Sequence, residues 1–367
     1  MLPVAELHLH IEGTLEPDLL VRLAERNHVA LPDRFAARHR FGSLQEFLDL
    51  YYASMRVLRT EADFYDLASA YLRRAAAAGV RRAEIFFDPQ SHTGSGVPLA
   101  AVIGGLTSAI ADCQDVSADL IMCFLRDLGP DAAMETLRAG LGFRDAFIGV
   151  GLDSAEVGYP PELFADVYRR AAAEGLHLVA HAGEEGPPEY VYQALDLLKA
   201  ERIDHGVRSV EDPALVARLR EERVPLTVCP LSNVALKVVG SMGEHVLPAM
   251  LDAGLNVTVN SDDPAYFGGY VDDNFAALQA ELKLDDQVLA GLAKNSFEAS
   301  FAADADKKRW SAEVDAWLTT RLVTERRARP GISPRSGRRW GRRCRGSPPP
   351  GRQTRCRRGS RQARRPA

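Results

Sequence analysis

ELHLHIEGTLEP (residues 6–17) places two histidines, His8 and His10, two positions apart in a short apolar run. Alternate side chains of a β-strand point to the same face, so both imidazoles would lie on one side of such a strand. One interpretation of this arrangement is that both imidazoles bind one metal ion. The other is that the two histidines only pack against neighbouring side chains. The choice between these alternatives depends on the rest of the chain.

Eight short apolar runs recur along the chain and predict eight strands. They are AELHLH (5–10), VRRAEIFF (80–87), ADLIMCFL (118–125), AFIGVGLD (146–153), LHLVAHA (176–182), RIDHG (202–206), VPLTVCP (224–230) and LNVTVN (255–260). Most intervals can hold a helix, and PALVARLREERV (213–224) starts after Asp212 as a capped helix does. Apolar strands that alternate with helices indicate a parallel sheet buried on both faces. We therefore predict an α/β fold of the (β/α)8 TIM barrel type, with a helical insertion after the first strand.

Polar residues stand at or directly after the ends of several of these runs. They are His181 and Glu184 at the fifth run, His205 at the sixth, and Asp262 and Asp263 after the eighth. The carboxyl ends of barrel strands meet at one mouth, where catalytic groups lie. We expect these side chains to converge there with the two histidines of the first run. A doubly wound open sheet is the alternative fold, but no GxGxxG or GxxxxGK[ST] motif follows any strand.

Three histidines and one carboxylate are a suitable ligand set for a divalent metal ion, most often zinc. Iron(II) or manganese could bind the same ligands, and the residue types do not decide between them. The five cysteines offer no alternative site, because none forms a CxxC pair. The expected cofactor is one zinc ion per chain.

The blocks ELHLHIEGTLEP, VAHAGEEGPPE (179–189), IDHGVR (203–208) and NSDDPAYFGGY (260–270) resemble the signature blocks of the adenosine and adenine deaminase family. This family belongs to the metal-dependent amidohydrolase-like barrels. The resemblance runs from about residue 3 to about residue 320. Four motifs in the same order are far more specific than any one of them.

The resemblance implies a role for each matching residue. The metal ligands that it implies are His8, His10, His181 and Asp262. Hydroxide from a zinc-bound water would attack C6 of a purine, and Glu184 would protonate ring nitrogen N1. His205 would orient the attacking water and stabilise or accept its proton. Asp263 would bind N7, and Gly183 would keep the backbone close to the ligand, although a tight turn explains Gly183 equally well.

One departure from the nucleoside branch bears on the substrate. Adenosine deaminases usually carry Asp where this chain has Glu12, and that Asp reaches the sugar. Glu is one methylene longer and would fill space that a ribose needs. The resemblance therefore implies hydrolytic deamination of adenine to hypoxanthine and ammonia, in purine salvage. The alternatives are deamination of adenosine or of N6-substituted adenines such as cytokinins, and an inactive barrel that binds purines.

Other polar residues receive weaker expectations. The histidines outside the motif blocks are expected to have surface or packing roles; they are His28, His39, His92, His177 and His245. Asp153 and Glu156 follow the fourth run, where a rim salt bridge and a substrate contact are equally compatible with the sequence. Residues 41–79 predict paired helices that form either a lid over the mouth or an outer packing layer.

The composition changes after Glu325, so we predict a barrel domain over residues 1–325 and a disordered basic tail over residues 326–367. The tail holds sixteen of the 45 basic residues and no acidic one, which leaves the barrel 29 basic and 50 acidic residues, a formal charge of −21. The tail is either an arm for nucleic acid or another anionic surface, or a stretch read out of frame through GC-rich coding sequence. We assign it no catalytic role.

The first residues, MLPVAELHLH, lack the basic and apolar regions of a secretory signal, and no run of eighteen apolar residues occurs. We therefore expect a cytoplasmic protein without a membrane segment. Its expected partner is a small-molecule purine. Nucleic acid is expected only if the tail is genuine, and an oligomer is compatible with the sequence.

Overall fold

Eight parallel strands form one sheet in which each strand pairs with the next along the chain. The computed structural model describes residues 1–31, 41, 42 and 44–328. The strands are β1 (Val4–His10), β2 (Val80–Phe87), β3 (Ser117–Leu125), β4 (Gly149–Asp153), β5 (His177–Ala182), β6 (Arg202–His205), β7 (Pro225–Val228) and β8 (Asn256–Val259). All eight predicted strands are confirmed, with ends that differ by up to three residues.

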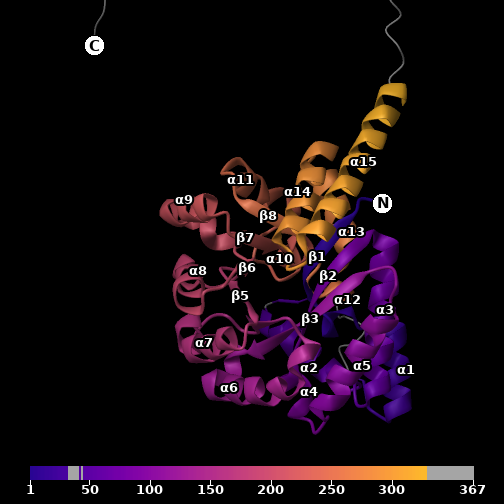
Figure 1. Cartoon of the computed structure of the whole chain (residues 1–367), viewed down its shortest axis with the longest axis vertical. Coiled ribbons are helices and arrows are strands. Elements are labelled where there is room, and N and C mark those ends of the chain that lie inside the picture. The colour runs from indigo at the N-terminus through magenta and orange to yellow at the C-terminus, as the bar shows by residue number, and fades with distance from the viewer. Residues whose placement is uncertain (32–40, 43, 329–367) are drawn as a thin grey trace, which may run out of the picture.

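Helices surround the strands, as Figure 1 shows. They are α1 (Pro17–Asn27), α2 (Leu44–Met55), α3 (Glu61–Ala78), α4 (Pro89–Thr93), α5 (Leu99–Asp112), α6 (Gly129–Gly140), α7 (Ala165–Ala173), α8 (Pro188–Gln193), α9 (Pro213–Glu222), α10 (Pro230–Ala235), α11 (Leu247–Asp252), α12 (Pro264–Phe267), α13 (Val271–Glu281), α14 (Asp286–Ala299) and α15 (Asp304–Ala328). The cap predicted for α9 is present, because Asp212 Oδ1 accepts a hydrogen bond from Ala214 N at 2.8 Å.

The first strand and the end of the last strand close the barrel. His10 N donates to Asp262 O, and Asp262 N donates to His8 O, both at 3.1 Å. Leu7 N donates to the side-chain oxygen of Asn260 at 2.8 Å. A doubly wound sheet would leave its two outer strands unpaired with each other, so these bonds exclude it. The predicted TIM barrel is confirmed.

The predicted helical insertion after β1 consists of α1, α2 and α3. Helix α3 packs against α5 on the outside of the barrel. Helix α2 lies at the mouth, where the ring of Phe47 contacts those of Tyr266 and Phe267 in α12 at 5.6 and 4.7 Å between centroids. For residues 41–79 the sequence left open a lid over the mouth or an outer packing layer. Each alternative describes one helix, because α2 covers the mouth and α3 belongs to an outer layer.

Helix α15 continues through the predicted boundary after Glu325 and ends at Ala328. It reaches beyond the other elements in Figure 1. The rest of the predicted basic tail, residues 329–367, lies outside the described residues. Over residues 1–31, 41, 42 and 44–328, no helix has both the length and the apolar character needed to cross a membrane.

A buried ion pair links strands β6 and β2 inside the barrel. Arg202 of β6 donates through Nη1 to Glu84 Oε2 of β2 at 2.7 Å, and both side chains are fully buried. Arg202 Nη2 also donates to the backbone oxygen of Leu7 in β1 at 3.2 Å. Burial would raise the pKa of Glu84, but the charges of Arg202 and Arg82 outweigh this effect and lower it. Glu84 therefore stays ionised, and its stability contribution depends on these arginines.

We expect Arg202→Met to lower the free energy of unfolding by about 3 kcal/mol, because it leaves a buried carboxylate with one arginine instead of two. Denaturation in urea measures this loss. The matched control is Arg218→Met, which breaks the pair with Asp196 at 2.7 Å, where the side chains are 28% and 53% exposed. That change should cost less than about 1 kcal/mol. Equal losses in the two variants would contradict the role given to the buried pair.

Candidate active site

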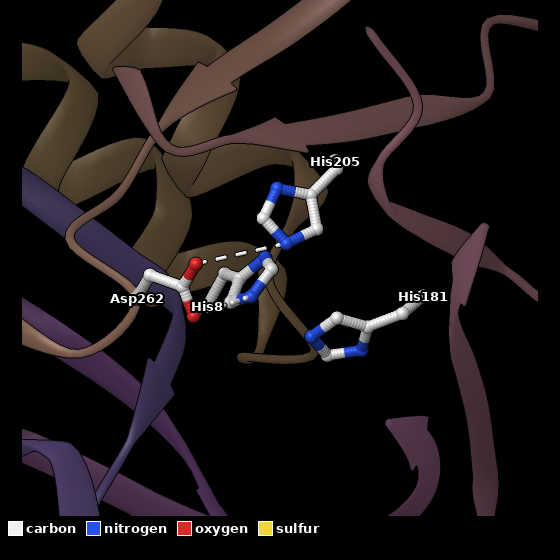
Figure 2. Close-up of side chains that lie close together, drawn as sticks. All are labelled: His8, His181, His205 and Asp262. Atoms are coloured by element: carbon white, nitrogen blue, oxygen red, sulfur yellow. Dashed lines mark ion pairs between the residues drawn. The ribbon is translucent and has the colours of Figure 1, made fainter. Parts of the chain in front are cut away.

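Side chains from four separate strand ends converge at the mouth of the barrel (Figure 2). They are His8 from β1, His181 from β5, His205 from β6 and Asp262 after β8. One ligand atom from each of these buried side chains lies within 4.8 Å of those of the others. His10 joins them, since its Nε2 atom is 3.3 Å from His181 Nε2 and 3.5 Å from Asp262 Oδ1. The structure therefore brings all four predicted metal ligands together.

The donor atoms of this group fit a divalent metal ion. His8 Nε2 is buried 3.4 Å from Asp262 Oδ1 and has no hydrogen-bond partner among the described residues. A buried ring nitrogen that faces a carboxylate in this way suits a metal ligand. Both His10 and His205 come within 3.7 Å of the Asp262 carboxylate. Two ligand sets therefore overlap: each contains His8, His181 and Asp262, and the fourth member is either His10 or His205.

Thr227 and Asp204 determine which nitrogen His8 turns to the site. Thr227 Oγ1 donates its one proton to Asp204 Oδ1 at 2.8 Å, so it must accept from His8 Nδ1, 3.0 Å away. When His8 is neutral it therefore carries its proton on Nδ1, and the lone pair of Nε2 faces the donor group. Asp204 Oδ2 also lies 3.7 Å from His181 Nδ1. No local sequence pattern predicted that Thr227 and Asp204 are positioning residues, although Asp204 directly precedes His205.

Burial sets the charges of these groups. It lowers the pKa of His10 to about 4 and that of His205 to about 3, and it holds the pKa of His181 well below its usual range. Burial would raise the pKa of Asp262, but the nearby His8 outweighs this effect and brings it well below the usual value. Near neutral pH His10 and His181 are therefore uncharged and Asp262 is ionised, as metal ligation requires. Despite burial, Asp262 and Asp204 raise the pKa of His8, so a metal ion that binds His8 Nε2 displaces a proton from the ring.

A cavity of about 430 Å³, part of it open to solvent, lies in front of the donor group. Helix α2 supplies an apolar and aromatic wall, with the side chains of Leu44, Phe47, Leu48, Tyr51 and Tyr52. Carboxyl groups line other parts of the cavity, namely Asp88, Asp153, Glu184, Asp262 and Asp263. The cavity is therefore apolar on one side and rich in hydrogen-bonding groups on the other, as small-molecule sites commonly are.

Most of these carboxyl groups have a pKa above the usual range, which favours their protonated form. Burial, together with neighbouring carboxylates, raises the pKa of Glu184, Asp263 and Asp88 well above the usual range. Burial raises the pKa of Asp153 to about 7. Glu184 Oε1 and Asp263 Oδ1 have no hydrogen-bond partner among the described residues. Protonated carboxyl groups of this kind can donate hydrogen bonds to a ligand in the cavity.

The loop that carries Glu184 is held by the carboxylate of Glu156. This carboxylate accepts hydrogen bonds from the backbone N–H groups of residues 183–186, at 2.7, 3.1, 2.8 and 2.7 Å. Neither a rim salt bridge nor a substrate contact, the two alternatives from the sequence, describes this role. Asp153 differs, since it lines the cavity and its Oδ2 atom is 3.5 Å from His10 Nδ1.

The structure favours the turn explanation for Gly183. Its φ angle is +73°, and a Cβ atom there would lie 2.8 Å from Val191 Cγ2. Its proposed closeness to a ligand stays a prediction. Gly13 shows a different constraint, because a Cβ atom on it would lie 2.6 Å from the Cα atom of Asp263. Glycine at position 13 therefore lets the two backbone segments pack directly.

Glu12 lies behind the cavity wall and is not among the cavity-lining residues. Its side chain is fully buried, and its Oε1 atom is 2.9 Å from His92 Nε2 and accepts from Asp88 N at 3.1 Å. Asp88 lines the cavity, so Glu12 can influence the cavity through Asp88. The sequence predicted a surface or packing role for His92 and gave no sign of this contact across 80 residues.

The fold and the site together define a TIM-barrel enzyme with a buried metal-donor group at its mouth. A family model described as adenosine deaminase matches residues 3–317, so the chain belongs to the adenosine deaminase family. Adenine deaminase from Streptomyces coelicolor is 60% identical to it over 325 residues, which cover 86% of this chain and 96% of that protein. The family and enzyme class predicted from the sequence are confirmed.

Solved structures agree with this assignment. Adenine deaminase from Arthrobacter aurescens is 54% identical, with a TM-score of 0.85 over 87% of this chain and 100% of that chain. An amidohydrolase from Burkholderia ambifaria, solved with bound zinc, is 30% identical, with a TM-score of 0.80 over 88% of this chain and 93% of that chain.

We expect Glu156→Gln to loosen the loop of residues 183–186. Glutamine has one acceptor oxygen and would turn an NH2 group toward backbone N–H donors. Hydrogen exchange measured by mass spectrometry should show these amides exchanging about tenfold faster or more, since a bond to a charged acceptor is lost. Metal content should not change. Exposed Glu162 of the same sequence region gives the control, Glu162→Gln. Unchanged exchange in Glu156→Gln would contradict the role of this carboxylate.

Proposed function

We propose that this chain catalyses the hydrolytic deamination of adenine to hypoxanthine and ammonia, with one zinc ion bound per chain. The observation that carries the proposal is the buried carboxyl of Glu184 beside the metal-donor group. Its Oε2 atom is 3.5 Å from His205 Nε2, and its Oε1 atom has no partner among the described residues. The 60% identity to the adenine deaminase of Streptomyces coelicolor supports adenine as the substrate.

The proposed zinc ligands are His8, His10, His181 and Asp262. Neutral imidazoles and one carboxylate suit zinc, and the zinc in the related amidohydrolase supports this choice. When bound, zinc supplies a Lewis acid that lowers the pKa of a water molecule and makes hydroxide available near neutral pH. The remaining steps depend on the side chains around the cavity.

Glu184 supplies the proton that the ring needs. Burial, with the nearby charges of Asp262 and Glu156, raises its pKa well above the usual range, which favours the protonated form that this step requires. Transfer of this proton to N1 neutralises the negative charge that builds up in the purine as C6 is attacked. His205, whose Nε2 atom is 3.5 Å from Glu184 Oε2, orients the attacking water.

The purine ring has three acceptor nitrogens, N1, N3 and N7, so uncharged carboxyl groups suit it as partners. Asp263 binds N7 in this proposal, because its protonated carboxyl can donate and its Oδ1 atom has no partner among the described residues. The Gly183 backbone lies close to the ligand in the same proposal. Glu12 excludes a ribose in this proposal by fixing the position of Asp88, which lines the cavity and whose N–H donates to Glu12 Oε1.

The proposal includes a place in purine salvage and in the cytoplasm. The three cysteines among the described residues, Cys113, Cys123 and Cys229, are free thiols, which accords with a reducing compartment.

We expect the full-length zinc-loaded protein to turn over adenine at least about a hundredfold faster than adenosine at equal concentrations. Ammonia release measures both rates. Glu12→Asp shortens the carboxylate and should gain activity on adenosine, and an unchanged preference would count against Glu12 as the residue that excludes ribose. Faster adenosine turnover in the wild type would move the chain to the nucleoside branch. Release of amine only from N6-substituted adenines would contradict adenine as the substrate, and no turnover of any of these would indicate a binding barrel.

Two variants should distinguish a defect in proton transfer from a defect in metal binding. Glu184→Gln should retain zinc and lose most turnover, about a hundredfold or more, because an amide cannot supply the proton. His10→Asn should lower the zinc content instead, because it removes a ligand. Metal analysis and ammonia release on the same samples measure both effects. Near-normal turnover in Glu184→Gln would refute the role of Glu184 as proton donor.

A further inference from the structure

A chain of hydrogen bonds runs behind His205, on the side away from the cavity. The backbone N–H of Leu247 donates to His245 Nδ1 at 3.0 Å. His245 Nε2 lies 3.1 Å from the side-chain oxygen of Asn233, and Asn233 Nδ2 lies 3.4 Å from His205 Nδ1. All three side chains are buried, with Asn233 fully so and His245 4% exposed.

The backbone of Leu247 fixes the direction of this chain. A backbone N–H can only donate, so His245 Nδ1 must accept, and the single proton of a neutral ring is then on Nε2. That proton goes to the Asn233 oxygen, which turns the Asn233 NH2 group toward His205 Nδ1. If the amide were reversed, both nitrogens of His245 would have to accept, which a neutral imidazole cannot do. Burial lowers the pKa of His245 to about 4, in accord with a neutral ring.

We propose that Asn233 and His245 are positioning residues that hold His205 in the tautomer with its proton on Nε2. His205 then takes part in the reaction as a hydrogen-bond donor and stays outside the ligand set of the metal. The reaction in this inference is the deamination proposed above, and the inference rests on it. The tautomer itself follows from the hydrogen bonds alone.

The donor faces the reacting side of the site. His205 Nε2 lies 3.5 Å from Glu184 Oε2 and 3.7 Å from Asp262 Oδ2, and Figure 2 shows this nitrogen directed at Asp262 while the other points away. A protonated Nε2 has no lone pair with which to bind a metal or to take a proton from water. It can hold the oxygen of an attacking water by donating to it.

This assignment separates the two overlapping ligand sets. Thr227 puts the proton of His8 on Nδ1 and leaves Nε2 as a donor for a metal. Asn233 does the reverse for His205, so that His205 cannot replace His10 as a ligand. Two histidines whose ring centroids lie only 4.6 Å apart therefore have opposite tautomers and different functions.

The tautomer can be observed directly. We expect nitrogen NMR of the full-length, zinc-loaded protein labelled with ¹⁵N-histidine to show a protonated Nε2 and an unprotonated Nδ1 for His205, with the signals assigned by their loss in His205→Gln. In Asn233→Asp, a carboxylate faces Nδ1, and the proton should move to that nitrogen. A protonated Nδ1 in the wild-type protein would overturn the proposal. This measurement needs no substrate, so it decides the tautomer even if adenine is not turned over.

Kinetics distinguish positioning from a structural role. We expect His245→Phe to lower kcat for adenine about tenfold or more with little change in KM. His245→Gln, which keeps a donor for Asn233, should restore part of this loss. In a His205→Gln background, His245→Phe should cost nothing further.

Tyr168→Phe is the control for loss of a buried hydrogen bond elsewhere, since Tyr168 Oη donates to Val179 O at 2.6 Å, and it should leave kcat unchanged. An equal loss from His245→Phe with and without His205 would overturn the positioning role. Failure of the wild-type protein to deaminate adenine would refute the proposed function, and the nitrogen signals would still confirm or refute the tautomer.

Discussion

The site depends on the main-chain pairing of Asp262 with β1. Two backbone hydrogen bonds join Asp262 to His8 and His10, and they close the barrel at the level of the donor group. Asp262 has a φ of +65°, a left-handed conformation that costs about 1 kcal/mol or more for a residue other than glycine. His205 has the same kind of backbone, with a φ of +64°. Both residues thus hold unusual backbone conformations at strand ends, and their side chains turn toward one point.

Burial gives this group its chemistry. The same exclusion of water that lowers the pKa of His10, His181 and His205 raises the pKa of Glu184 and Asp263. Asp262 is the exception, because the adjacent His8 outweighs the cost of burying its charge. Within one cavity, His8 therefore lowers the pKa of Asp262, whereas burial and neighbouring carboxylates raise the pKa of Glu184 and Asp263.

The sequence predicted the parts of the molecule that follow from strand periodicity. Eight apolar runs alternating with helices were enough to predict the barrel. The period-two spacing of His8 and His10, with Glu184, His205 and Asp262 at strand ends, was enough to predict the convergence. The missed contacts join a strand end to a distant segment, as between Gly183 and Glu156, 27 positions apart, or between His205 and Asn233, 28 positions apart. Such contacts depend on the path of the connecting loops, which no local pattern encodes.

Asp262 closes the barrel through its N–H and C=O groups, while its carboxylate faces the donor group. The closing bonds are therefore available to any residue that tolerates a left-handed backbone, whatever its side chain. Asparagine, which adopts this conformation readily, could replace aspartate there and keep the barrel closed. The backbone atoms of Asp262 thus maintain the fold, and its carboxylate serves the chemistry. A substitution at this position could therefore abolish or change the activity during evolution while the barrel stays closed.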